Sequence, residues 1–367
     1  MKGRFVYVFL ASLFLLAVIS TPLLASWTVV NLNPAGAGWS IAAGAYGGQQ
    51  VGGAAFAGDY TDHAGLWTGN AGSWVDLNPA GADRSFAEGV SEGQQAGRAR
   101  ITGGVYHASL WSGDAESWVD LHPAGADWSE AYGISGGQQV GHAYVGGSYH
   151  AALWSGSAGS WVDLNPAGAA YSLAFGVYGG QQVGRVGIDG SYHAGLWNGD
   201  AESWVDLNPS GSAWSEAYGI SGGQQVGDAA IGGSYHAGLW RGNAGSWVDL
   251  NPAEAAWSRA EGVSGGRQVG YAGIHGSYHA SLWSGTAESW VDLHALLPAG
   301  VYSWSEAKGV YASAGETRVT GYAVNAATDQ WEAMLWHYTP DVVPEPSSFL
   351  ALGSGLLALC GAIRRRK

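Results

Sequence analysis

The chain has 367 residues, among them 61 Gly and 20 Trp, and only 12% of its residues are charged against 47% hydrophobic, which argues against intrinsic disorder. A single cysteine argues against a disulfide scaffold, a cysteine-based zinc site and an iron–sulfur protein. The net charge of −14 argues against nonspecific binding of nucleic acid, because that binding needs lysine and arginine against phosphate.

Residues 1–26 are predicted to form a secretory signal peptide. Lys2 and Arg4 give a positively charged start, and an apolar run follows from Phe5 to Ile19. The segment just before residue 27 lacks a clean small-x-small motif, so the cleavage point stays open. The alternative is an uncleaved N-terminal anchor, for which the apolar run is short.

The pentapeptide Ser-Trp-Val-Asp-Leu recurs along the middle of the chain. Its tryptophan stands at positions 74, 118, 161, 204, 247 and 290, with a looser copy at Trp27, so the period is close to 43 residues. That period is typical of four-stranded propeller blades. Three more segments recur in each unit, in the order Ser-x-Ala-x-Gly, Gln-Gln-Val-Gly and His-Ala-x-Leu-Trp.

Each recurring segment is predicted to be a short strand, because it is bounded by Gly, Asn, Pro or Ser turns. The Ser-x-Ala-x-Gly strand should be innermost, since glycine permits close approach of two backbones. Residues 27–338 are therefore expected to form an all-β fold, a seven-bladed β-propeller of four-stranded blades. The N-terminal strand should complete the last blade and close the ring, whereas the alternative is an open solenoid.

The repeat text resembles the HAF repeat of exported bacterial propeller-like proteins. The segments that carry the resemblance are H-A-A-L-W ending at Trp154, V-D-L-N ending at Asn165, S-E-A-Y-G-I-S starting at Ser129 and G-Q-Q-V-G ending at Gly141. The Phe of H-A-F is absent from this sequence. The resemblance implies a propeller fold and an exported location, and it implies no assigned activity.

Ser, His and Asp recur in every full unit, which is the composition of a hydrolytic triad. The residues are His63, His107, His150, His193, His236 and His279, with Asp76, Asp120, Asp163, Asp206, Asp249 and Asp292. Catalysis needs one asymmetric constellation, whereas six equivalent copies are typical of blade structure. We therefore expect no catalytic site, no metal site and no cofactor. Each Asp should cap a turn, and each His should bond a neighbouring backbone group.

Two sets of aromatic residues are predicted to gather on one face of the ring. The first set precedes Ser-x-Ala-x-Gly and comprises Trp39, Trp128, Tyr171, Trp214, Trp257 and Trp304, with Arg84 in the second unit. The second set precedes the histidines and comprises Tyr106, Tyr149, Tyr192, Tyr235 and Tyr278. Both loops should emerge on the same face, because strand direction alternates. Such rings suit stacking on sugars; the alternative is that they pack between blades.

One position varies between units while the surrounding framework is constant. The residue after Gln-x-x-Gly is Arg98, His142, Arg185, Asp228 and Tyr271 in the second to sixth units, and Gly53 and Tyr322 in the first and seventh. Any functional asymmetry of the ring is expected at these positions. The alternative is drift between repeats on a solvated surface.

The C-terminus has three parts. A linker, residues 339–348, carries Pro344, Glu345 and Pro346; residues 349–363 are a predicted short transmembrane segment; residues 364–367 are a basic tail, Arg364, Arg365, Arg366 and Lys367, placed in the cytoplasm by the positive-inside rule. This tail resembles the PEP-CTERM sorting signal of exported bacterial proteins. The resemblance implies a Gram-negative-type bacterium, processing by an exosortase, a transient inner-membrane anchor and a final location at the cell surface or in the extracellular matrix.

Between the two ends, residues 27–343 hold 9 of the 15 basic and 28 of the 29 acidic residues, a net charge of −19. We expect an exported, noncatalytic surface or extracellular-matrix protein that binds exopolysaccharide through an aromatic loop face, with no nucleic-acid partner. One alternative is a structural or adhesion scaffold with a protein partner. The other is a glycan lyase or hydrolase with its site in the central channel, which a cluster of Asp, Glu, His or Arg at the channel mouth would favour.

Overall fold

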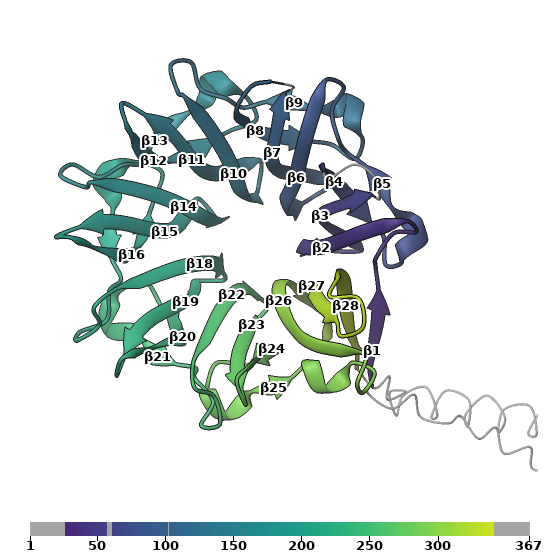
Figure 1. Cartoon of the computed structure of the whole chain (residues 1–367). Helices are drawn as coiled ribbons and strands as arrows, with labels where there is room; N and C mark the ends of the chain where they lie inside the picture. The colour runs from purple at the N-terminus through teal and green to yellow at the C-terminus, as the bar shows by residue number, and fades with distance from the viewer. Residues whose placement is uncertain (1–25, 57–60, 102, 341–367) are drawn as a thin grey trace, which may run out of the picture. The chain divides into compact units, whose positions relative to one another are not determined.

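The computed structural model describes residues 26–56, 61–101 and 103–340. Seven four-stranded antiparallel sheets stand around a central axis (Figure 1), which confirms the predicted all-β propeller. Residues 27–339 form one compact unit. The predicted signal peptide up to residue 25, the PEP linker from residue 341, the short transmembrane segment and the basic tail lie outside the described residues.

Each blade takes its strands in chain order, and the blades are numbered along the chain. Blades one to three contain β2 (Ala37–Tyr46), β3 (Gln49–Phe56), β4 (Asp62–Trp67) and β5 (Val75–Asp76); β6 (Ala82–Ser91), β7 (Gln94–Ile101), β8 (Tyr106–Trp111) and β9 (Val119–Asp120); β10 (Trp128–Ser135), β11 (Gln138–Val145), β12 (Ser148–Trp154) and β13 (Val162–Asp163).

Blades four to six repeat this plan, and blade seven borrows its outer strand from the other end of the chain. They contain β14 (Tyr171–Tyr178), β15 (Gln181–Ile188), β16 (Ser191–Trp197) and β17 (Val205–Asp206); β18 (Ser215–Ser221), β19 (Gln224–Ile231), β20 (Ser234–Trp240) and β21 (Val248–Asp249); β22 (Ser258–Ser264), β23 (Arg267–Ile274), β24 (Ser277–Trp283) and β25 (Val291–Asp292); then β26 (Tyr302–Ser313), β27 (Glu316–Asn325), β28 (Trp331–Thr339) and β1 (Ser26–Asn31).

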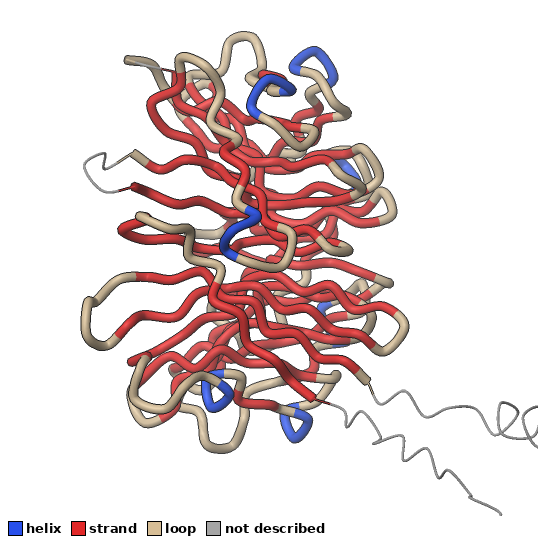
Figure 2. The backbone as a smooth tube through the Cα atoms, turned by 90° about the vertical axis from the view of Figure 1, so that its right-hand side faces the viewer, coloured by secondary structure: helices blue, strands red, loops and turns tan. Residues whose placement is uncertain are grey.

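Short 3-10 turns complete the pattern on the outside of the ring. One such turn lies between the third strand and the outer strand of each of blades one to six: η1 (Ala71–Ser73), η2 (Ala115–Ser117), η3 (Ala158–Ser160), η4 (Ala201–Ser203), η5 (Ala244–Ser246) and η6 (Ala287–Ser289). A further turn, η7 (His294–Leu296), follows β25. Seen from the side, the strands run between the two faces of the ring and the loops gather at those faces (Figure 2).

The glycine of each first strand explains why these strands lie innermost. A methyl group on Gly176 would lie 2.7 Å from the carbonyl oxygen of Tyr218 in the next blade, closer than a Cβ can approach. The same approach recurs around the axis and closes the circle, because a methyl group on Gly309 of blade seven would lie 2.7 Å from the Ala43 oxygen of blade one. The predicted inner position of this strand is therefore confirmed.

Blade seven is closed by the N-terminal strand, as predicted. The backbone N–H of Leu32, just after β1, donates to the oxygen of Ala333 in β28 at 2.8 Å. Ser40 then joins this blade to blade one, because its Oγ accepts from the Ala333 N–H at 2.9 Å and donates to Asn33 at 2.6 Å. The predicted closed ring is thus correct and the open solenoid is not.

The hydrophobic core lies between neighbouring blades. One tryptophan of each third strand is fully buried, and in blades one to six it is the last residue of the strand; these residues are Trp67, Trp111, Trp154, Trp197, Trp240, Trp283 and Trp336. At the junction of blades one and two, for example, Trp111 packs with Leu66, Leu77, Val51 and Val90. Seven such interfaces hold the ring together, so the tryptophans of this set serve packing.

Candidate functional site

The two predicted aromatic sets lie at one face of the ring, and at three neighbouring junctions they touch. The strand register brings them together, since Trp128 pairs with Tyr144 across one ladder and Tyr144 with Tyr149 across the next. Rings of successive blades meet with centroid distances of 5.4 Å for Tyr192–Trp214, 5.5 Å for Tyr235–Trp257 and 5.5 Å for Tyr278–Trp304. We call the surface formed by both sets, together with Trp331, the aromatic face.

The junctions around blades two to four use other contacts. Trp128 packs on its own blade, against His142 at 4.8 Å and Tyr149 at 5.3 Å between ring centroids. Tyr171 has the Arg185 guanidinium over its ring at 5.9 Å, and Tyr106 has those of two arginines, Arg98 and Arg100. In blade two this position is Arg84, within β6. The ring contacts therefore belong to blades four to seven, as a separate Tyr192–Trp214 pair and an unbroken run from Tyr235 to Trp331. The loop placement expected for the first set is wrong for Trp39, Trp128, Tyr171 and Trp304, because the first strands extend to include them.

The rings of the aromatic face are neither fully buried nor free. Tyr149, Tyr278 and Trp331 are 36%, 37% and 39% exposed, and the rest of the two sets are half-buried. Each ring that touches a neighbour is held in one orientation and keeps part of its surface in water. Packing between blades and contact with a ligand are thus compatible here, and the ligand role of the two sets stays a prediction.

The junction of blades seven and one departs from the others. Trp331 stands where blades two to six have the second-set tyrosine, and Trp39 in β2 is the first-set tryptophan that follows it around the ring. These two side chains line a cleft of about 410 Å³ together with Gly38, Ile41 and a pair of exposed polar residues, Asp329 and Gln330. The repeated sequence motifs did not indicate this cleft. The one feature that could have indicated it is the seventh unit, whose sequence departs from that of the other units.

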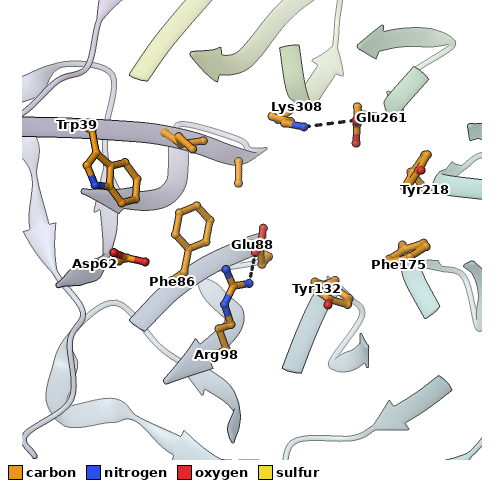
Figure 3. A pocket seen from close by; sticks show the side chains of 12 residues that line it. Trp39, Asp62, Phe86, Glu88, Arg98, Tyr132, Phe175, Tyr218, Glu261 and Lys308 are labelled. Atoms are coloured by element: carbon orange, nitrogen blue, oxygen red, sulfur yellow. Dashed lines mark hydrogen bonds and ion pairs between the residues drawn. The ribbon is translucent and has the colours of Figure 1, made fainter. Parts of the chain in front are cut away.

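Charged side chains line a second hollow, on the axis of the ring. This cavity measures about 440 Å³ and includes Trp39 of the aromatic face in its wall. Figure 3 shows Glu88 beside Arg98 and, across the open space, Glu261 beside Lys308, with Tyr132 and Tyr218 nearby. The first-strand residues around the central glycine thus point into the channel.

Three of the variable positions, Arg98, Arg185 and Asp228, form ion pairs with first-strand residues, and Glu261 and Lys308 pair with each other. Arg98 lies 2.5 Å from Glu88 of its own blade and 3.5 Å from Glu130 of the next. The other pairs also cross blade junctions: Arg185 with Glu216, Asp228 with Arg259 at 3.0 Å, and Glu261 with Lys308 at 3.4 Å. The charged variable residues thus lie where neighbouring blades meet, and a functional asymmetry at these positions stays a prediction.

Two variable residues carry strongly altered protonation equilibria. Burial, with the charges of Arg98 and Arg185, lowers the pKa of His142 to about 3, so this imidazole is neutral at pH 7. Burial raises the pKa of Asp228 to about 7, against the opposing effect of Arg259. His142 is 1%, Asp228 0% and Tyr271 7% exposed. These three positions are therefore not on the solvated surface that the alternative assumes, while drift between repeats stays an open alternative.

The repeated His and Asp residues bond to each other. In blade three, His150 Nδ1 lies 2.7 Å from Asp163 Oδ2, and the other Asp163 oxygen accepts from the Asn165 N–H at 2.8 Å. The same pair recurs as His63–Asp76, His107–Asp120, His193–Asp206, His236–Asp249 and His279–Asp292. The predicted turn cap is confirmed, whereas the predicted His–backbone bond is wrong, because the register of β12 and β13 brings the imidazole to the carboxylate.

The repeated serine is buried away from these pairs. In blade four, Ser172 Oγ accepts from the Ala151 N–H of blade three at 3.0 Å and donates to Asn165 at 2.7 Å. It is 0% exposed. Ser129 Oγ lies 2.9 Å from Nδ1 of His122, which replaces the asparagine in this blade. Ser129 is also fully buried. These hydroxyls connect blades and are buried from solvent.

Two further properties concern the parts of the chain that the structure describes. Among residues 26–56, 61–101 and 103–340, no three His, Cys, Asp or Glu side chains gather in a way that could hold a metal ion. Within the same ranges, no helix has the length and apolar character that crossing a bilayer needs. The predicted membrane segment, residues 349–363, falls outside them.

Residues 342–367 match the family model of the PEP-CTERM protein-sorting motif. The chain therefore carries this sorting signal, which confirms the resemblance drawn from Pro344, Glu345, Pro346 and the terminal arginines and indicates an exported protein. A search of curated proteins found no match. The resemblance to HAF repeats is not tested by these comparisons and stays a prediction.

Among solved structures, peptidase propellers resemble this chain in fold. A puromycin hydrolase aligns with a TM-score of 0.53 and 12% identity over 82% of this chain and 56% of its own. A prolyl endopeptidase aligns with a TM-score of 0.54 and 9% identity, over 84% of this chain and 51% of its own. The β-propeller domain of the Trilobed protease from Pyrococcus furiosus aligns with a TM-score of 0.51 and 12% identity. The alignment covers 82% of this chain and 94% of that domain. The chain spans about half the length of the first two proteins, and the likeness extends to the fold alone.

Proposed function

We propose that this protein is an exported, noncatalytic propeller that binds extracellular polysaccharide through its aromatic face. The observation that carries the proposal is the line of half-exposed Tyr and Trp rings from Tyr235 to Trp331, together with the separate Tyr192–Trp214 pair. Such rings offer a flat apolar surface to the C–H face of a pyranose and a polar edge to its hydroxyl groups.

The packing of the rings supports the same function. Each ring of this line rests on a neighbour with a centroid distance between 4.5 and 5.8 Å, so its orientation is fixed before a ligand arrives. Binding to a fixed ring costs less side-chain entropy than binding to a free one. A polysaccharide that contacts several blades at once also gains from multivalency.

The sorting signal gives the protein its proposed destination. An exosortase recognises the tail, residues 342–367, while a short apolar segment holds the protein in the inner membrane. Processing then releases the propeller to the cell surface or the extracellular matrix. Polysaccharide is the abundant polymer at that place, which agrees with a carbohydrate-binding face.

The charged axial cavity is the feature that a glycan lyase or hydrolase in the channel would need. Its ionisable groups are engaged with one another within and across blades: Arg98 pairs with Glu88 of its own blade and Glu130 of the next, and Lys308 pairs with Glu306 of its own blade and Glu261 of the preceding one. This pairing accounts for them as structural contacts within and between blades. We therefore place the function at the aromatic face and not in the channel.

A retention assay on immobilised polysaccharides tests the proposal. The full chain in mild detergent is compared with a variant that combines Trp214→Ala, Trp257→Ala and Trp304→Ala. The matched control combines Tyr46→Ala and Tyr178→Ala, because these exposed tyrosines end first strands at the opposite face. Circular dichroism and melting curves confirm that each variant folds.

We expect the wild type and the control to be retained on a neutral polysaccharide, and the triple variant to lose at least about tenfold in affinity, because each lost stacking contact contributes about 0.5–1.5 kcal/mol. Absence of retention on every polysaccharide, or equal retention of all three proteins, contradicts the proposal. Retention with equal loss in the control would point to a different face.

A further inference from the structure

We infer that the cleft between blades seven and one is a sugar subsite that takes one neutral pyranose residue of the bound polysaccharide. The inference rests on the proposed function and gives it a place and a ligand class. It starts from a break in the symmetry of the ring. At the junctions of blades four to seven the tyrosine of one blade contacts the tryptophan of the next, with centroids 5.4 to 5.5 Å apart.

At the seventh junction this contact is replaced by a gap. Within the described residues Trp39 has no aromatic partner, although its counterparts Trp214, Trp257 and Trp304 each have one. Trp39 and Trp331 instead stand in the wall of the cleft of about 410 Å³. Small-ligand sites typically have volumes of about 300–1,000 Å³, so the cleft has room for a sugar ring.

The wall of the cleft is fixed by its surroundings. Trp331 stacks on Tyr322 with centroids 4.8 Å apart and an interplanar angle of 15°, and its edge contacts Trp304 at 5.8 Å. It is also 39% exposed, and it is the one tryptophan of the described residues in the exposed class. A large aromatic side chain that is both immobilised and exposed is suited to hold a ligand.

A longer loop brings two polar side chains to the cleft. Five residues, 326–330, separate β27 from β28, whereas two glycines, Gly146 and Gly147, join the corresponding strands of blade three. The loop is held by its own backbone, because the Asp329 N–H donates to the Asn325 oxygen at 2.8 Å and the Asn325 N–H donates to the Gln330 oxygen at 2.9 Å. The side chains of Asp329 and Gln330 bond no other described group.

This set of groups selects the ligand class. The indole rings suit the C–H face of a pyranose, while the Asp329 carboxylate accepts from sugar hydroxyls and the Gln330 amide can donate and accept. The carboxylate and the net charge of −19 for residues 27–343 repel uronates, sulfates and phosphates. The ligand is therefore a neutral sugar residue.

Calorimetric titration of the full chain tests the subsite with three probes: cellopentaose, mannopentaose and pentagalacturonate. One cleft variant combines Trp39→Ala and Gln330→Ala. A second, Asp329→Asn, keeps the backbone intact, because asparagine tolerates the φ of 57° at this position. The control is the opposite-face variant with Tyr46→Ala and Tyr178→Ala, and melting curves check folding.

We expect a neutral pentasaccharide to bind the wild type and the control, and the double cleft variant to lose at least tenfold in affinity. Asp329→Asn should lower the affinity for the neutral probe severalfold. It should also reduce the ratio between the affinities for the neutral probe and for pentagalacturonate. If a neutral probe binds and both cleft variants bind it as the wild type does, the subsite is refuted while the proposed function stands. Tighter binding of the uronate refutes the ligand class. If no probe binds the wild type, the subsite and the proposed function both fail.

Discussion

At the scale of single residues, the repeat uses polar groups as ties between blades. The serine of each first strand would be a candidate nucleophile by composition alone. In the structure, Ser172 is fully buried and bonded on both sides, to Ala151 and Asn165. Its hydroxyl satisfies a backbone N–H that would otherwise be buried without a partner, which would cost about 1–3 kcal/mol. The repeated Ser thus serves stability.

His142 gives a residue-scale prediction about pH. Its folded-state pKa of about 3 lies below the unfolded value of 6.5, so the folded protein binds fewer protons than the unfolded chain between these values. Stability contributed by the neutral ring is therefore complete above pH 6.5 and is lost as the pH falls toward 3. The loss reaches at most about 1.4 kcal/mol for each pH unit.

The measurement is urea unfolding of the wild type and of His142→Tyr between pH 7 and pH 4. Tyrosine is chosen because blade six has Tyr271 at the equivalent position. The variant lacks the titrating group, so the difference between the two free energies of unfolding should shift in favour of the variant as the pH falls. Parallel profiles would show that His142 is free to accept a proton in the folded state.

At the scale of strands, the central glycine sets the spacing of the first strands. Gly176→Ala should lower the free energy of unfolding by about 1–3 kcal/mol, because the added methyl group would lie 2.7 Å from the Tyr218 oxygen and the strands must separate. Gly159→Ala, in the outer turn η3 of blade three, is the control, since its methyl group would meet no atom within 4 Å. Equal denaturation midpoints for the two variants would refute this role of Gly176.

The order of the strands was predictable because each segment recurs in every unit. The small residues of the Ser-x-Ala-x-Gly segment indicated that this strand lies next to the axis. The partners of the repeated histidines were not predictable in the same way. His150 meets Asp163 only because β12 and β13 pair in one particular register, and a repeat pattern does not fix register between its segments. The burial of His142 and Asp228 beside the axis likewise follows from how adjacent sheets face each other.

At the scale of the whole molecule, the ring is closed at the junction where its sequence is least regular. Blade seven combines β1 with β26, β27 and β28, and its loop 326–330 is longer than the two-glycine turn of blade three. Units that copy one another produce the line of Tyr–Trp contacts, which sequence spacing could place on one face. The cleft beside Trp331 arises from the departure from the repeat, so no periodic pattern could indicate it.

The central claim is that the aromatic face, and not the channel or the opposite face, holds the polysaccharide. The most direct measurement is a crystal structure of the protein with the neutral oligosaccharide that binds it most tightly. The account predicts sugar rings against the Tyr and Trp rings of blades four to seven, with one pyranose in the cleft between Trp39 and Trp331. Sugar bound in the channel beside Glu88 and Lys308, or near Tyr178 at the other face, would contradict it.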